Sequence, residues 1–249
     1  MSQFNEPAPK PEKVEPIHPV KRWARTLVGH YSLCVCMGAA LCLSLLPGLA
    51  LVYLFLGSGG LIFLAAAIPA LGLAGPVWAA TQRVCWEIQF GFPTYLFKSF
   101  WREIRRNFYQ GFLLGMLTGF LWLLLGLVLF FASSYEVKIP FLVRVVVILA
   151  AGLLSAAACY SFYQITRWKL SLPAVIGNSL LLFFAVGLRT IAVAVLWLVF
   201  VFLLLRYYLV AVPLCLVCGL PALMCMTSQA IFVPRLDALL NASKESSEP

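Results

Sequence analysis

Long apolar runs alternate with short polar segments along the whole chain. A helix needs about 20 apolar residues to cross a bilayer, and each run meets or exceeds that length once its interruptions are allowed for. The pattern therefore predicts an all-α polytopic transmembrane bundle of about six spans. The expected spans are Leu27–Leu56, Leu61–Glu87, Gly111–Phe131, Phe141–Ile165, a fifth with its core at Thr190–Leu205, and Ala211–Phe232. The apolar segment Ser171–Gly187 precedes the fifth span, and Arg189 separates the two.

The first two runs contain residues that distort helices. Pro47 and Gly48 lie inside the first run, and proline breaks the backbone hydrogen-bond ladder of a helix. The first run is also too long for one straight, untilted span. It predicts either one kinked helix or a helix followed by a re-entrant piece. Distortions in the second run are expected at its Pro and Gly positions, which are Pro69, Gly72, Gly75 and Pro76.

The segment Tyr95–Gln110 has a different pattern, with aromatic and basic residues on opposite sides of a helix. Phe97, Phe100, Trp101, Ile104 and Phe108 recur at helical spacing. Such a pattern is typical of a helix that lies in the membrane interface. We expect its cations at the cytoplasmic surface, where they bind either anionic lipid headgroups or an acidic patch on a partner. The candidates for this contact are Lys98, Trp101, Arg102, Arg105 and Arg106.

Close helix contact is predicted where small residues repeat. Gly111, Gly115 and Gly119 stand four residues apart at the start of the third run. A stripe of this kind lets two helices in a membrane approach closely.

Both ends of the chain are polar. Five prolines and alternating charges predict a disordered tail over residues 1–22. A helical membrane domain is expected over 23–235, and a short polar tail over 236–249.

Composition limits the class of protein. Apolar types make up 63% of the 249 residues, charged types make up 11%, and the mean hydropathy is +0.97. A soluble domain has roughly 45–50% apolar and about 25% charged residues. This balance excludes an ordinary cytosolic enzyme, a disordered protein and a secreted disulfide scaffold.

The net charge of +9 fits a membrane protein better than a nucleic-acid-binding one. With the N-terminus inside, 15 Lys and Arg residues fall on the cytoplasmic side and three fall outside: Lys138, Arg144 and Arg206. This bias follows the positive-inside rule. It predicts that both termini are cytoplasmic.

Motifs for catalysis are missing from the sequence. It contains no Walker A or HExxH motif, and no chain of acidic or histidine residues that would suit a proton-coupled carrier. Cys215 and Cys218 have CxxC spacing, but no second pair or histidine cluster accompanies them. We expect no enzyme activity, no cofactor and no metal.

Polar residues within or near the spans are the remaining candidates, because ionisable groups there are costly and often functional. Arg83 and Glu87 are separated by one helical turn and could pair. The alternative is that each side chain reaches to the headgroups. The candidates are Arg83, Glu87, Asn107, Asn178 and Arg189.

One region resembles a known family. The run GLAGPVWAATQRVCWEIQFGFPTYLFKSFWREIRRNFYQGFLLG, from Gly72 to Gly115, is similar to the YesL family of small bacterial integral membrane proteins. Gly75-Pro76 precedes Ala79-Ala80, Arg83 ends a helix, and Phe97–Asn107 leads into a span. The later stretch RWKLSLPAVIGNSLLLFF looks like the family's second junction. Gln89-Phe90-Gly91-Phe92 replaces the family's usual acidic loop.

The resemblance implies a context and no mechanism. Family members are often encoded beside carbohydrate importers of the ATP-binding cassette type. It implies a non-catalytic accessory or modulatory subunit of such an importer, in the bacterial plasma membrane. The alternative function is a stand-alone transporter or channel. The oligomeric state, the partner and the sugar stay open.

Overall fold

The computed structural model describes residues 19–90, 95–134, 140–168, 170–206 and 218–245. Within these ranges the chain is helical and contains no strand, which confirms the predicted all-α class. The helices are α1 (Pro19–Gly29), α2 (Tyr31–Ser58), α3 (Leu61–Gly72), α4 (Ala74–Gln89), α5 (Leu96–Arg106), α6 (Phe108–Ser134), α7 (Phe141–Arg167), α8 (Leu172–Val186), α9 (Leu188–Arg206) and α11 (Leu220–Glu245).

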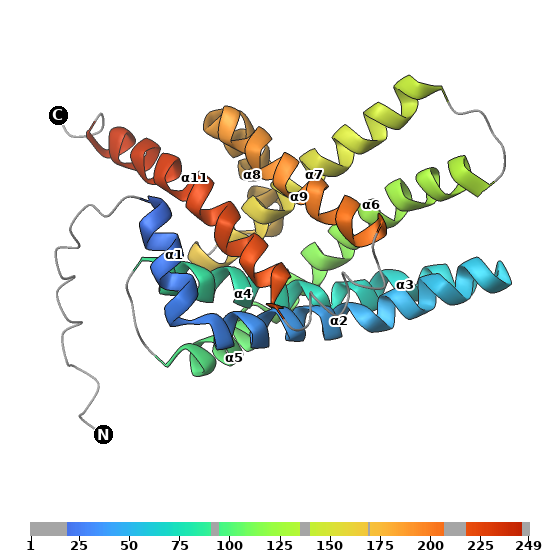
Figure 1. The fold of residues 1–249 in the computed structure, drawn as a ribbon, viewed down its shortest axis with the longest axis horizontal. Helices are drawn as coiled ribbons and strands as arrows, with labels where there is room; N and C mark the ends of the chain where they lie inside the picture. Colours follow the sequence, from blue (N-terminus) through green and yellow to red (C-terminus); the bar gives the residue numbers. More distant parts are fainter. Residues whose placement is uncertain (1–18, 91–94, 135–139, 169, 207–217, 246–249) are drawn as a thin grey trace.

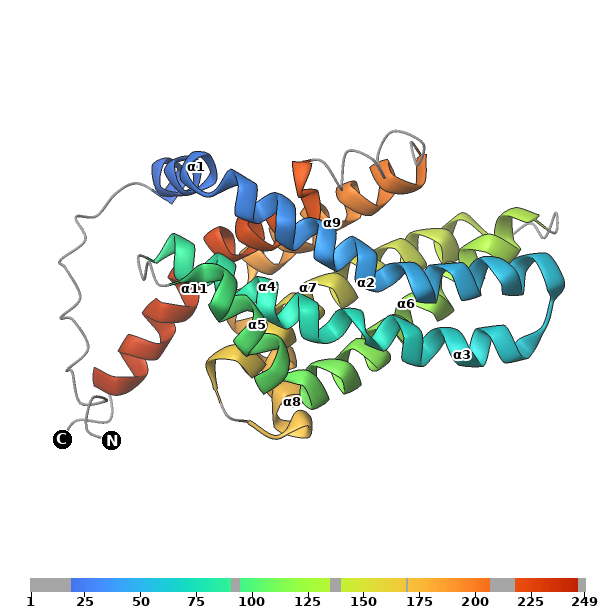
Figure 2. The same cartoon turned by 90° about the horizontal axis from the view of Figure 1, so that it is seen from below.

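The long helices run back and forth along the long axis of the molecule. The chain runs out along α2, back along α3 and α4, out along α6, back along α7, out along α9 and back along α11 (Figure 1). The start of α1 and the end of α11 lie at the same end of the molecule in both views (Figure 2). The shorter helices α5 and α8 connect the long ones.

Among the described residues, four helical stretches are long and apolar enough to cross a membrane. They are Tyr31–Ser58, Leu61–Gln89, Phe108–Val128 and Val145–Arg167. The pair α8 and α9 passes the same test together, with a bend of 108° between its two parts, and would make a fifth. Of the sixth run expected from the sequence, residues 211–217 lie outside the described residues.

The prolines act differently in the first two spans. α2 is one continuous helix that includes Pro47, so the first run contains no helix break at the proline. The second span does break. α3 ends at Gly72 and α4 starts at Ala74, while Pro69 lies inside α3. The Leu73 amide donates to the carbonyls of Ala70 and Leu71, which gives the tighter hydrogen bonding of a distorted helix end.

Helical structure extends further toward both ends than the sequence suggests. α1 begins at Pro19, within the segment expected to be a disordered tail. Proline suits the first position of a helix, because its missing amide would have no partner there. α11 continues to Glu245, past the expected boundary at residue 235. Val233 and Leu236 are buried on α11, so packing supports the helix across that boundary.

The second and third spans cross at glycines. A Cβ atom placed on Gly115 would lie 2.7 Å from the Gly72 carbonyl oxygen and 2.9 Å from the Gly75 Cα. A Cβ on Gly111 would lie 2.9 Å from the Pro76 Cα. All these neighbours are backbone atoms. The predicted small-residue stripe is therefore the contact surface between α6 and the α3–α4 break.

Hydrogen bonds connect α4 to α11, although the two helices are far apart in sequence. Gln229 Nε2 donates to the Gln82 backbone oxygen at 2.6 Å and also contacts Gln82 Oε1. Gln89 Nε2 donates to the Met226 carbonyl at 2.8 Å. Both glutamines of α4 are buried. These bonds hold the first half of the chain against its last helix.

Candidate interaction site at the α4–α5 junction

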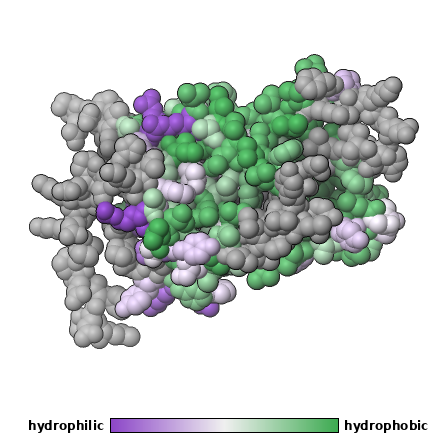
Figure 3. All heavy atoms as spheres, in the orientation of Figure 1, coloured by the Kyte–Doolittle hydropathy of each residue, from purple (hydrophilic) through white to green (hydrophobic). Residues whose placement is uncertain are grey.

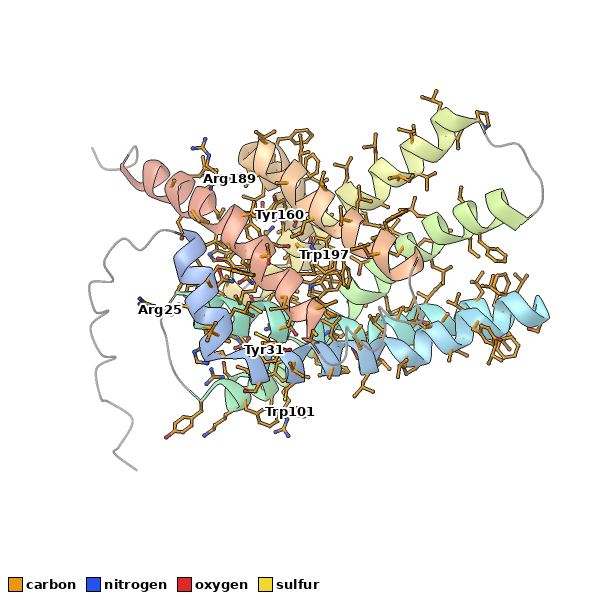
Figure 4. All side chains as sticks on the ribbon, in the orientation of Figure 1. Arg25, Tyr31, Trp101, Tyr160, Arg189 and Trp197 are labelled. Carbon is orange, nitrogen blue, oxygen red and sulfur yellow. The ribbon has the colours of Figure 1, made fainter. Side chains whose placement is uncertain are left out.

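The helix α5 presents cations to the outside of the molecule. Lys98, Arg102, Arg105 and Arg106 are all exposed. Strongly hydrophilic residues on the face drawn in Figure 3 gather toward the end at which α1 begins and α11 ends. Trp101 is also exposed and points away from the bundle (Figure 4). The five docking candidates from the sequence thus lie on one exposed surface, which we call the α5 basic surface.

The inner side of α5 packs against the protein rather than against lipid. Phe100 was expected in the aromatic membrane face, but it is only 5% exposed and belongs to the main hydrophobic core. Ser99 and Glu103 are buried beside it. Phe97 and Trp101 keep their exposed positions. The aromatic residues of α5 are therefore divided between the core and the outer surface.

The helix is also shorter than the expected Tyr95–Gln110. It ends at Arg106, and α6 starts at Phe108 after a break at Asn107. Asn107 Nδ2 donates to Glu103 Oε2 at 2.9 Å. The backbone of Asn107, with φ −106° and ψ 18°, departs from the dihedral angles of an α-helix. The buried Asn107 therefore marks the corner at which the chain turns into the third span.

Glu87 joins α4 to α5. Arg83 Nε lies 2.8 Å from Glu87 Oε1, so of the two alternatives that their spacing left open, the structure has the ion pair. Ser99 Oγ donates to Glu87 Oε2 at 2.8 Å, across 12 residues of chain. Arg102 Nη2 donates in turn to Ser99 Oγ at 3.3 Å. With Glu87 only 3% exposed, this chain of bonds fixes α5 from its inner side.

A second buried carboxylate supports the same helix. Glu103 is 1% exposed and accepts from Asn107 and from Arg106 Nη1, the latter at 3.4 Å. Buried charges are usually paired or hydrogen-bonded, because an isolated one is very costly. Arg106 is therefore partly neutralised by Glu103. Lys98, Arg102 and Arg105 contribute the remaining positive charge of the α5 basic surface.

Trp86 connects this junction to α7. The Arg167 guanidinium carbon lies 3.7 Å from the centre of the Trp86 ring, and that of Arg83 lies 5.3 Å away. Cation–π contacts of this kind are favourable within about 6 Å. On α11, partial desolvation raises the pKa of Asp237, and the positive charge of Arg167 opposes that rise. The junction thus contains positive groups from α4, α5 and α7.

Asn178 and Arg189 lie on other helices. Asn178 is half-buried within α8, and its neighbour Ser179 makes the contact with α7 by bonding to Ser161 and Gln164 at 2.8 Å each. Arg189 is exposed at the start of α9, where its Nη1 donates to the Ile231 carbonyl at 3.4 Å. Of the five polar candidates, the structure brings Arg83 and Glu87 together and places Asn107 at the other end of α5.

Ser99 and Trp86 are site residues that the sequence interpretation missed. A small polar residue inside an aromatic and basic helix is a weak signal, but Ser99 lies four residues before Glu103, so the two share one helix face. That inward polar face could have been found from the spacing. The stacking of Arg167 on Trp86 depends on the packing of α7 and has no local signal.

The arrangement is suited to presenting a charged surface. In the described ranges no group of three or more His, Cys, Asp or Glu residues is placed to hold a metal ion. The buried carboxylates of Glu87 and Glu103 are bonded to arginine, serine or asparagine side chains.

Comparison of the chain with protein-family models, with curated proteins and with solved structures finds no match to any of them.

Proposed function

We propose that this protein is a non-catalytic membrane subunit that docks an acidic patch of a partner protein on its α5 basic surface. The observation that carries the proposal is the fixed position of α5. Its inner side is bonded through Ser99 to the buried Glu87, while Lys98, Arg102 and Arg105 stay exposed. A helix held in this way offers cations in a defined arrangement.

Defined geometry favours a protein partner over loose adhesion to lipid. Arginine binds carboxylates through two parallel hydrogen bonds, and this geometry is useful only where the guanidinium groups are held in place. Arg102 is oriented by its bond to Ser99. A diffuse layer of lipid headgroups responds mainly to charge. Anionic lipid is therefore the competing explanation that the experiment has to separate from docking.

The resemblance to the YesL family supplies the class of partner. On that basis we propose that the partner is a subunit of a bacterial carbohydrate importer of the ATP-binding cassette type. The α5 basic surface would lie on the cytoplasmic side of the plasma membrane, together with both termini. This orientation rests on the 15-to-3 distribution of Lys and Arg along the sequence.

Purification of the tagged full-length chain from its native membrane in mild detergent tests the proposal. We expect importer subunits to co-purify with the unmodified protein. Arg102→Lys combined with Arg105→Lys keeps the charge but removes the planar guanidinium groups. This double variant is expected to insert normally and to lose its partner.

A matched control for this experiment is Arg25→Lys, because Arg25 is an exposed arginine on α1 (Figure 4). It should retain the partner. If the double lysine variant retained the partner fully, or if the unmodified protein recovered none, arginine docking would be abandoned in favour of lipid anchoring.

A stand-alone transporter or channel is the second candidate. Buried polar side chains inside the bundle favour it, namely the Gln82–Gln229 pair and the group around Ser179. These groups bond mainly to one another. Solute flux by the purified protein in liposomes without any partner would support this candidate against the accessory role.

A further inference from the structure

An apolar groove lies between α9 and α11 on the outer surface of the bundle. Ile231 lines it on the α11 side. Its other residues recur three and four apart along α9, so they form one face of that helix. They are Leu188, Ile191, Ala192, Val195, Leu196 and Val199.

This face of α9 is open to the surroundings. Leu188 is 81% exposed, and Ile191, Val195 and Val199 are each more than half exposed. Exposed apolar patches of this kind mark membrane or protein interaction sites. The groove is wide and shallow, and its apolar lining suits a hydrocarbon chain.

A cation stands at one end of the groove. Arg189 follows Leu188 directly and donates through Nη1 to the carbonyl of Ile231, a residue of the groove itself. Its side chain points outward beside α11 (Figure 4). A guanidinium carries five N–H donors, and the bond to Ile231 uses one of them. The other donors are on an exposed side chain at the mouth of the groove.

The neighbouring groups strengthen the positive character of this end. Arg235 is exposed and lies one helical turn after Ile231, so it shares that side of α11. The next residue of α9, Thr190, faces inward and bonds to Tyr160 at 2.9 Å. The start of α9 therefore has a buried hydrogen bond at Thr190 on its inner side and the exposed Arg189 on its outer side.

We propose that this groove binds one anionic phospholipid, with its phosphate on Arg189 and one acyl chain along α9. The apolar lining matches the chain, and the guanidinium matches a phosphate, with which arginine forms paired hydrogen bonds. Arg235 adds charge on the same side. A spanning helix of another protein would match the lining but would leave the Arg189 donors without an anion.

Native mass spectrometry of the detergent-purified full-length protein tests this site. Added phosphatidylglycerol is expected to give a singly bound species, and phosphatidylcholine with the same acyl chains is expected to bind more weakly. Arg189→Gln should weaken the binding of phosphatidylglycerol about fivefold, the factor corresponding to one cation near an anionic leaflet. Ala192→Phe should reduce binding of both lipids, because the ring fills the groove.

Two control variants test whether the loss of lipid binding is specific to the groove. Arg25→Gln removes an equally exposed arginine, and Ala65→Phe adds a ring at an exposed position of α3 outside the groove. Both should bind phosphatidylglycerol as the unmodified protein does. Thermal unfolding checks that all four variants are folded.

Three results would overturn the site. The first is equal binding of the two lipids. The second is unchanged binding by Arg189→Gln or Ala192→Phe. The third is full competition by inorganic phosphate, which would show an anion site that has no need of a lipid chain. The partner proposed for α5 is not involved in any of these measurements, so the two proposals fail separately.

Discussion

Substitution of Gly115 by alanine is the most direct test of how the second and third spans pack. The added methyl group would lie 2.7 Å from the Gly72 carbonyl oxygen. That distance is about 0.7 Å short of the 3.4 Å at which ordinary contact begins. The obstructing atoms belong to the backbone of α3 and α4, so no side chain can turn aside. The two helices would have to move apart.

The size of the effect follows from two opposing contributions. Forcing an extra methyl group into a packed interface costs ~1–3 kcal/mol. Replacing glycine with alanine inside a helix raises the free energy of unfolding by roughly 0.5–1 kcal/mol, because alanine has the higher helix propensity. We therefore expect Gly115→Ala to lower the free energy of unfolding by about 1 kcal/mol, and by at most roughly 2.5 kcal/mol.

The matched control is Gly126→Ala in the same helix. A Cβ on Gly126 would meet no atom within 4 Å. Gly126→Ala therefore has no packing cost and only gains the higher helix propensity of alanine. The difference between the two variants is then the packing cost itself, ~1–3 kcal/mol. For a chain of this size it corresponds to about 2–12 °C in Tm.

Thermal unfolding in one detergent, followed by circular dichroism, measures this difference. Gly115→Ala should unfold below the unmodified protein and Gly126→Ala at or above it. If the two variants unfolded at the same temperature, α6 would not cross α3 and α4 at the glycines, and the helix contacts described above would be wrong.

Three further outcomes are expected. Ser99→Ala should speed amide hydrogen exchange across α5, because the helix loses its bond to Glu87; unchanged exchange would mean that core packing alone holds α5. In cells with the cysteines replaced, a membrane-impermeant thiol reagent should label Leu142→Cys and not Lys98→Cys, and the reverse pattern would invert the orientation. Tyr160→Phe should lower the free energy of unfolding by about 1 kcal/mol through loss of its buried hydrogen bond, and a variant as stable as the original protein would show that the bond contributes nothing.

The helices and the glycine crossing could be predicted because each depends on local spacing. Runs of apolar residues define long helices, and glycines four residues apart on α6 define a face. Arg83 and Glu87 are one turn apart on a single helix, so their spacing allowed the pairing. It left open the alternative that each side chain reaches the headgroups.

The inner face of α5 could not be predicted in the same way. An aromatic residue on a membrane protein is equally suited to a lipid environment and to a packed core, because lipid tails are as apolar as leucine. The pattern therefore placed Phe100 with Phe97 and Trp101, although only Phe100 is buried in the core. The pairing of α4 with α11 was also beyond the sequence, since its bonds join residues 137 and 147 positions apart.

The α4–α11 bonds also set an order of events during synthesis of the chain. Gln82 and Gln89 leave the ribosome long before Met226 and Gln229 exist. At about 5–20 residues per second, the delay between the two helices is roughly 7–30 s. Throughout that interval the Gln82 and Gln89 side chains lack the partners that they have in the finished fold. The contact between α4 and α11 can therefore form only after the last helix has been made, so it closes the bundle at the end of synthesis.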